Sequence, residues 1–188
     1  MKKLLITAFD PFGGADSNPS ELAIGLLPER LGGFEITKRV VPTVYGEATA
    51  QTLAVAETLR PDVILCIGVA VGRDAVTPER VALNLQDARI PDNAGNQPTD
   101  TAVVPGAPTA YFATVPVKAI VQAMTDAGLP ARISNTAGTF VCNDLFFGLC
   151  HRFAGTNTRV GFIHVPATDV MSLEQIARAL DAAITACE

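Results

Sequence analysis

The sequence contains no tryptophan, only two histidines, and few aromatic residues (6%). Charged residues are also scarce, at 18% of the 188 residues, and the net charge at pH 7 is −5. A chain with this charge offers no basic face for phosphate groups, so we expect no nucleic-acid partner. The hydrophobic fraction of 48% excludes intrinsic disorder and predicts one globular domain over residues 1–188.

Long apolar segments are also missing. No stretch approaches the ~20 apolar residues of a membrane-spanning helix, so no membrane partner is expected. The start, MKKLLITAFDPFGG, superficially resembles a secretory leader, but its apolar run of residues 4–9 is too short and no small-residue cleavage site follows. We interpret it as a first buried strand and expect a cytoplasmic protein.

The four cysteines do not form a Cys-x-x-Cys pair, and with two histidines they give no support for a zinc site. In a cytoplasmic protein we expect free thiols. Free cysteine is among the most buried residue types, so core packing is the default interpretation. It suits Cys66, within the apolar run DVILCIG, and Cys150, near the end of a helix, while Cys187 lies next to the C-terminus with no assigned role.

Strand-like and helix-like segments alternate along the chain. The expected strands are 3–8, 34–41, 62–68, 80–85, 131–134 and 160–165, and the expected helices are 46–59, 117–127 and 141–153, with one more after Asn18 and one after Ser172. Asn18 precedes Pro19 as an N-cap, and Ser172 with Gln175 forms a capping box. This alternation predicts an α/β fold, a sandwich with helices on both faces of a mostly parallel, twisted sheet.

Residues 86–114 hold many turn-forming residues, and a connection of this length is typical of a functional or interface loop.

Cys142 differs from the other cysteines because of its surroundings, SNTAGTFVCNDLFFGLCH (134–151). If a helix begins near Phe140, the thiol lies in its first turn, where unpaired N–H groups and the helix dipole stabilise a thiolate. The same amides could bind the oxyanion of a carbonyl under attack. Gly138 provides the backbone freedom for a sharp entry. Cys142 is therefore a candidate nucleophile, with a buried first-turn thiol as the alternative.

A cysteine nucleophile needs a base. His151 is nine residues farther along the same helix, about 13.5 Å away, and cannot reach Cys142 while that helix is intact. His164 ends the strand GFIHV, at the carboxyl end where ligands of α/β sheets bind, so elimination selects it. An acid should orient the imidazole, and the residues leave four candidates: Asp10, Glu79, Asp92 and Asp144.

Five segments of the chain are similar, in the same order, to the pyroglutamyl peptidases, also called pyrrolidone-carboxylate peptidases. They are TAFDPFGG with NPS (7–14 and 18–20), TPERVALN (77–84), DARIPDNAGNQP (87–98), SNTAGTFVCN (134–143) and GFIHVPA (161–167). The resemblance implies an α/β/α fold and a cytoplasmic homotetramer. It also implies a cysteine exopeptidase that removes N-terminal pyroglutamate (5-oxoproline) from peptides without a metal or other cofactor, through a triad of Cys142, His164 and Glu79.

Pyroglutamate has no charged amine, because its side chain has closed on the nitrogen as a lactam. Its pocket should therefore be apolar and flat-walled, with a few hydrogen bonds for the ring N–H and carbonyl. The resemblance implies pocket positions at Phe9, Phe12, Asn18, Phe140 and Val141, and we expect Ile90 to form another wall. Core burial would also explain the first two, and helix capping would also explain Asn18. The resemblance further implies a site arginine, Arg73, whose charge would favour thiolate and oxyanion.

The chain departs from the family pattern before Arg73. It reads Gly-Val-Ala-Val-Gly-Arg where Gly-Gln-Ala-Gly-Gly-Arg is usual, so Val69 and Val71 change that loop, and Ala8 stands where glycine is usual. Two alternatives stay open: an enzyme like the nucleoside phosphorylases on a similar α/β scaffold, which would use phosphate and no thiol, and a catalytically inactive pyroglutamate-binding protein.

Overall fold

The computed structural model describes all residues, 1–188. Its centre is a six-stranded sheet with the order β2-β3-β1-β4-β8-β5. The four inner strands run parallel: β3 (Phe34–Val41), β1 (Lys2–Phe9), β4 (Val63–Val69) and β8 (Arg159–Val165). The short edge strands β2 (Arg30–Leu31) and β5 (Thr77–Pro78) are antiparallel. The predicted mostly parallel sheet is confirmed.

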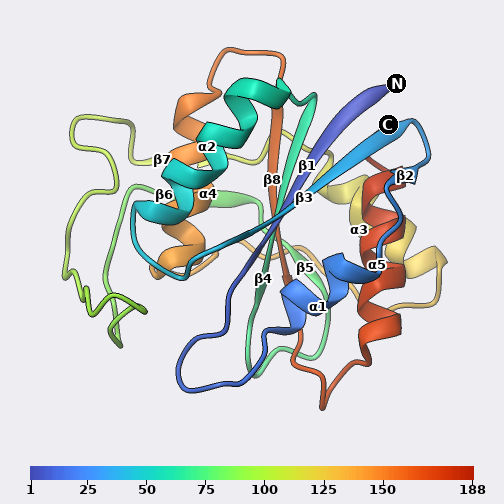
Figure 1. Ribbon diagram of the computed structural model, residues 1–188, viewed down its shortest axis with the longest axis horizontal. Coiled ribbons are helices and arrows are strands. Elements are labelled where there is room, and N and C mark those ends of the chain that lie inside the picture. The colour runs from blue at the N-terminus through green and yellow to red at the C-terminus, as the bar shows by residue number, and fades with distance from the viewer.

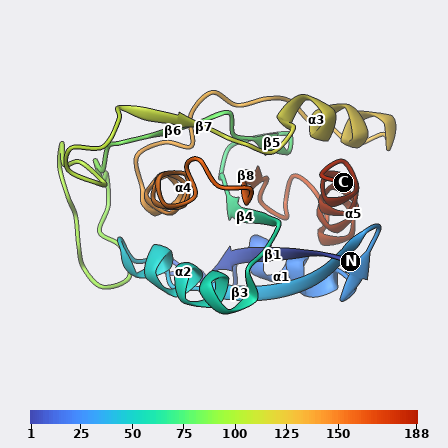
Figure 2. The same ribbon diagram turned by 90° about the horizontal axis from the view of Figure 1, so that it is seen from above.

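Helices cover both faces of this sheet (Figures 1 and 2). On one face, α1 (Pro19–Leu26) and α3 (Val117–Asp126) both pack against α5 (Leu173–Thr185). On the other, α2 (Glu47–Leu59) packs against α4 (Val141–Arg152), and the two-stranded sheet of β6 (Val81–Leu83) and β7 (Ala110–Phe112) lies against α4. The predicted α/β/α arrangement is confirmed.

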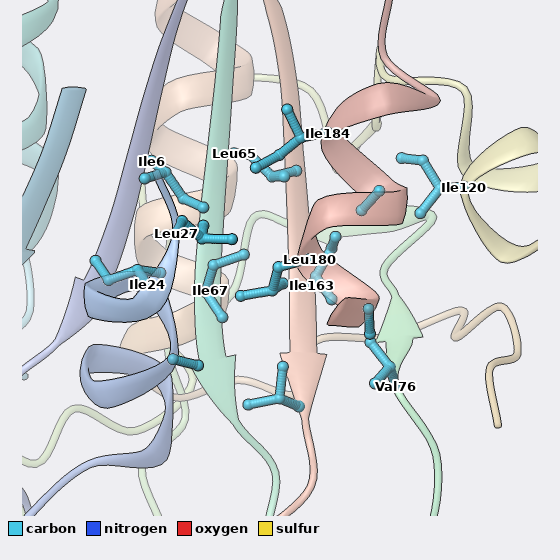
Figure 3. Packing of buried hydrophobic residues seen from close by; sticks show 14 of the residues in the cluster. Ile6, Ile24, Leu27, Leu65, Ile67, Val76, Ile120, Ile163, Leu180 and Ile184 are labelled. Carbon is cyan, nitrogen blue, oxygen red and sulfur yellow. The ribbon is translucent and has the colours of Figure 1, made fainter. Parts of the chain in front are cut away.

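Each sheet face has its own apolar core, because successive side chains of a strand point to opposite faces. On β4, Leu65 and Ile67 belong to the cluster beneath α1 and α5, whereas Ile64 and Cys66 belong to the cluster beneath α2 and α4. Figure 3 shows the first cluster, in which Leu180 of α5 lies close to the central strands. The burial of β4 on both faces explains its unbroken apolar sequence.

Local sequence signals fix several element ends. Asn18 caps α1 by accepting a hydrogen bond from the N–H of Ser20, and the capping box of Ser172 and Gln175 begins α5. Helix α4 begins at Val141, close to the predicted position. No helix of the chain combines the length and apolar character needed to cross a bilayer.

The predicted strand at 131–134 is wrong. This segment makes two isolated bridges, Val76 with Ala131 and Glu79 with Ser134, instead of a continuous ladder. Backbone hydrogen bonds form around each of the two bridges. Pro78 lies between the bridges and has no N–H to donate. The missing donor interrupts the ladder at the residue where a continuous strand would need it.

Candidate active site

The candidate nucleophile lies at the carboxyl edge of the parallel sheet. Gly68 of β4 and His164 of β8 are partners in the strand register. The Sγ atom of Cys142, in the first turn of α4, lies so close to Gly68 that a Cβ atom added there would be 3.0 Å from it. The fold therefore brings the start of α4 next to the strand that pairs with His164.

His164 is held by a buried carboxylate. Its Nδ1 lies 2.7 Å from Oε1 of Glu79, and the two residues are 4% and 0% exposed. The N–H of Glu79 donates to the carbonyl of Phe162, and the Phe162 ring lies 4.8 Å from the imidazole. Because Nδ1 faces the carboxylate, it carries the proton and Nε2 is left as the acceptor nitrogen.

The other three candidate acids are engaged elsewhere. Asp144 accepts hydrogen bonds from the N–H of Gly46 and from a glutamine side chain. Asp92 accepts from the N–H of Tyr45 and from its own loop. Asp10 accepts from the segment that follows β3. These carboxylates order the loops around the site, and among the four candidates Glu79 alone contacts His164.

Burial sets the protonation of the cysteine and histidine. It raises the pKa of the half-buried Cys142 thiol to about 12, and the Glu79 carboxylate acts in the same direction. Burial lowers the pKa of His164, which its hydrogen bond to Glu79 opposes. These directions favour a neutral thiol beside a neutral imidazole at pH 7. In this state, burial outweighs the stabilisation of a thiolate that the helix start was expected to give.

Arg73 lies against the carboxylate of Glu79. Its NH1 donates to Oε1 of Glu79 at 2.6 Å and to Oγ1 of Thr77, and its NH2 donates to the carbonyl of Thr136 at 3.3 Å. The second oxygen of Glu79, Oε2, has no hydrogen-bond partner. The predicted site arginine thus contacts the acid behind His164.

A cavity of about 320 Å³ opens beside the start of α4. Its lining residues are Phe12, Val69, Val71, Asp87, Arg89, Ile90, Thr139 and Phe140. The rings of Phe12 and Phe140 are 6.4 Å apart, and Tyr45 meets Phe140 edge-on at 5.5 Å. Val69 follows Gly68 and Phe140 precedes Cys142 by two residues, so this mostly apolar cavity opens near the thiol, which does not itself line it.

Of the six predicted pocket residues, Phe12, Ile90 and Phe140 line this cavity. The other three are buried and do not. Phe9 packs against Phe162, with ring centroids 6.3 Å apart, Val141 belongs to the core cluster beneath α4, and Asn18 caps α1 and donates to the carbonyl of Asp10.

Several residues around the cavity were missed from the sequence. Asp87 and Arg89 lie within the motif DARIPDN, so the resemblance contained a signal for both. Tyr45 holds the wall through its ring and donates its hydroxyl to the carbonyl of Thr139. Tyr45 lies in no recognised motif, and its contact with the cavity wall depends on the tertiary position of the segment before α2.

Of the remaining cysteines and histidine, only Cys66 acts on the site, by raising the pKa of the Cys142 thiol. All four cysteines are free thiols, and Cys66 and Cys150 are buried in the cluster beneath α2 and α4, as core packing predicts. The hydroxyl of Tyr111 lies 3.0 Å from Nδ1 of His151. No group of three His, Cys, Asp or Glu side chains is arranged to hold a metal ion.

Known proteins are similar to this chain in sequence and fold. The family model described as pyroglutamyl peptidase matches residues 2–188. A pyrrolidone-carboxylate peptidase of Streptococcus pyogenes is 47% identical over 98% of this chain and 91% of its own length, and one of Escherichia fergusonii is 44% identical over 98% and 92%. The crystal structure of pyroglutamyl peptidase I from Bacillus amyloliquefaciens matches with a TM-score of 0.95 and 42% identity, covering 100% of this chain and 97% of that one. The chain therefore belongs to the pyroglutamyl peptidase family of cysteine hydrolases.

Proposed function

We propose that the protein is a cysteine exopeptidase that removes pyroglutamate from the N-terminus of peptides, with Cys142 as nucleophile, His164 as base and Glu79 as orienting acid. The observation that carries this proposal is the 2.7 Å contact between Nδ1 of His164 and Glu79. This contact leaves Nε2 free to accept a proton, beside the strand residue that Cys142 contacts. Family membership supports the substrate class.

In the first half of the reaction, Nε2 of His164 takes the proton of the Cys142 thiol as sulfur attacks the pyroglutamyl carbonyl. The raised pKa of the thiol makes this transfer part of the attack, since little thiolate exists beforehand. The N–H groups of Val141 and Cys142 have no backbone acceptor, and in the first turn of α4 they can bind the oxyanion.

In the second half, the carbon–nitrogen bond breaks and His164 gives its proton to the departing amine. A thioester between Cys142 and the pyroglutamyl group remains. Water, deprotonated by His164, attacks this thioester, and the products are pyroglutamic acid and the free thiol. The carboxylate of Glu79 stabilises the imidazolium that forms in each half.

Specificity for the cyclised residue follows from the apolar cavity. A lactam brings no charge into the cavity that Phe12 and Phe140 line, whereas an open N-terminal residue would bring an ammonium group. No carboxylate except Asp87 lines the cavity, so that charge would be poorly compensated. We therefore expect peptides that begin with glutamate or glutamine to be poor substrates.

Hydrolysis of pyroglutamyl-aminocoumarin tests the proposal. Cys142→Ser should lose activity by at least about 10³-fold while its circular dichroism is unchanged, because serine is a poor nucleophile here. Cys150→Ser, in the same helix, is the matched control and should retain activity. A Cys142→Ser variant within tenfold of the parent rate would overturn the nucleophile assignment.

The inactive alternative has one supporting observation: Val69 and Val71 line the cavity, where the family pattern has glutamine and glycine. Calorimetric binding of pyroglutamate by a protein that releases no aminocoumarin would favour it. An enzyme like the nucleoside phosphorylases would instead require phosphate and survive alkylation by iodoacetamide, so the same assay before and after alkylation tests it.

The proposal extends to a single catalytic domain over residues 1–188 that assembles as a cytoplasmic homotetramer. The family match over residues 2–188 supports the first part. Exposed apolar side chains at Leu22, Leu26 and Phe112 are compatible with subunit contacts. Light scattering should give four times the chain mass of 19.7 kDa, and a monomer would contradict the assembly.

A further inference from the structure

The guanidinium of Arg73 is fixed by contacts with three residues from two parts of the chain. It donates to Oε1 of Glu79 at 2.6 Å, to the hydroxyl of Thr77 on β5 and to the carbonyl of Thr136, which precedes α4. Its side chain is 26% exposed, whereas that of Glu79 is fully buried. Arg73 therefore covers the carboxylate from the solvent side in one defined orientation.

The carboxylate of Glu79 is bound through a single oxygen. Oε1 receives both Arg73 and Nδ1 of His164, and Oε2 has no partner. The terminal torsion of a glutamate is broad, so one contact from His164 would not define the direction of this carboxylate. With Arg73 present, Oε1 is held from two sides and the imidazole has a fixed acceptor.

We propose that Arg73 is a positioning residue for the reaction, which fixes Oε1 of Glu79 and through it the tautomer and orientation of His164, instead of binding the substrate oxyanion. The inference rests on the proposed Cys142–His164–Glu79 triad and adds a fourth member behind it. It also gives the Arg73–Glu79 pair a role in the rate in addition to stability.

The charge of Arg73 has a second consequence, for pH dependence. The charged groups that act on His164 are Glu79, which raises its pKa, and Arg73, which lowers it. At Cys142, Arg73 also lowers the pKa of the thiol, against Glu79 and the neighbouring Cys66 of β4, which raise it. Loss of the positive charge therefore raises the pKa of His164. Since a protonated imidazole cannot accept the thiol proton, the acid limb of kcat/KM should move to higher pH.

A double-mutant cycle on pyroglutamyl-aminocoumarin hydrolysis tests this role. The variants of the cycle are Arg73→Gln, Glu79→Gln and the two combined. Arg73→Lys is added because it keeps the positive charge but lacks the planar guanidinium group. Arg132→Gln is the matched control, because Arg132 forms an ion pair of the same 2.6 Å length with Asp74 on the exposed surface. Thermal unfolding confirms that each variant is folded.

Arg73→Gln should lower kcat by about 10- to 100-fold with little change in KM, because a displaced base costs rate more than binding. In the Glu79→Gln background the same change should cost less than about threefold, because the group through which Arg73 acts has gone. Arg73→Lys should lower kcat but leave the acid limb in place, whereas Arg73→Gln moves that limb upward. Arg132→Gln should match the parent protein.

An equal loss in both Glu79 backgrounds would overturn the inference, since it would mean that Arg73 acts elsewhere, for example at the oxyanion. A parent-like Arg73→Gln would also overturn it. If Arg73→Gln does not fold, Arg73→Lys replaces it in the cycle. Failure of the triad itself gives a different result: the Cys142→Ser variant would then keep its activity, whatever the Arg73 variants do.

Discussion

A cysteine and a histidine lie near each end of α4, and the two pairs differ in their chemical surroundings. At the start, Cys142 touches Gly68 at the carboxyl edge of the sheet, where the imidazole of His164 is bound to Glu79. At the end, Cys150 and His151 are adjacent in the sequence. Cys150 is buried in the core, and His151 stacks on Phe147 without a carboxylate partner.

The difference shows that sequence adjacency does not make a catalytic pair. Neighbouring residues of a helix point in directions about 100° apart, so Cys150 and His151 diverge. The two helix ends also have opposite dipole signs: free N–H groups at the start favour an anion, and free carbonyls at the end oppose one. Burial raises the pKa of both thiols, but only Cys142 has unpaired amides in its own turn and lies beside Gly68, the strand partner of the carboxylate-bound His164.

Separate substitution of the two histidines is the test of this comparison with the largest expected effect. His164→Gln should lower kcat/KM by about 10³-fold or more, because no other base can take the Cys142 proton. His151→Gln should stay within about twofold, since its loss removes one partly exposed contact with Tyr111. Initial rates on pyroglutamyl-aminocoumarin measure both. Comparable losses in the two variants would remove the distinction between the helix ends.

Two glycines allow a finer comparison. A Cβ atom at Gly68 would lie 3.0 Å from the sulfur of Cys142 and 3.0 Å from the Phe162 ring. A Cβ atom at Gly148, which lies in α4 beyond Cys142, would be 2.7 Å from Thr49 of α2. Gly68→Ala should displace the sulfur by a few tenths of an ångström and lower kcat about tenfold. Gly148→Ala should leave the rate unchanged and alter only stability, by about 1–3 kcal/mol of overpacking offset by about 1 kcal/mol of helix propensity.

The rate and the thermal unfolding midpoint of each glycine variant separate the two effects. A parent-like rate for Gly68→Ala would mean that the sulfur can move freely against β4, contrary to the close packing described above. A slowed Gly148→Ala would mean that the distant half of α4 also sets the position of Cys142.

The sequence predicts the fold well because its signals are local. Unbroken apolar runs identify strands buried on both faces, and caps at Asn18 and Ser172 mark helix starts. The predicted strand at 131–134 fails because the outcome depends on its neighbour, where Pro78 lacks a donor. Strand pairing is set by tertiary contacts that a single segment does not encode.

The residues of the candidate site also divide into those that sequence signals identify and those that depend on tertiary contacts. The setting at a helix start singles out Cys142 as a candidate nucleophile, and elimination leaves His164 as its base, since His151 is too far along the helix. Reasoning from the residues could not select Glu79, because its contact requires the antiparallel pairing of β5 with β8. Pocket residues are harder still. Phe9 and Phe12 are three positions apart, yet Phe9 ends a strand with its ring in the core and Phe12 follows the strand and reaches the cavity.

The pH dependence of the rate gives the smallest and most specific test of the comparison. Burial lowers the pKa of His164 from its ordinary value of 6.5, and the base must be neutral to accept the thiol proton, so the acid limb of kcat/KM should lie below pH 6.5. His151→Gln should leave this limb in place, because that histidine takes no part in proton transfer. Rates between pH 4.5 and 8, at about half-unit steps, would locate the limb. A limb above 6.5 would mean that the imidazole is stabilised as a cation, and the neutral pair at the start of α4 would then have to be replaced by a thiolate–imidazolium pair.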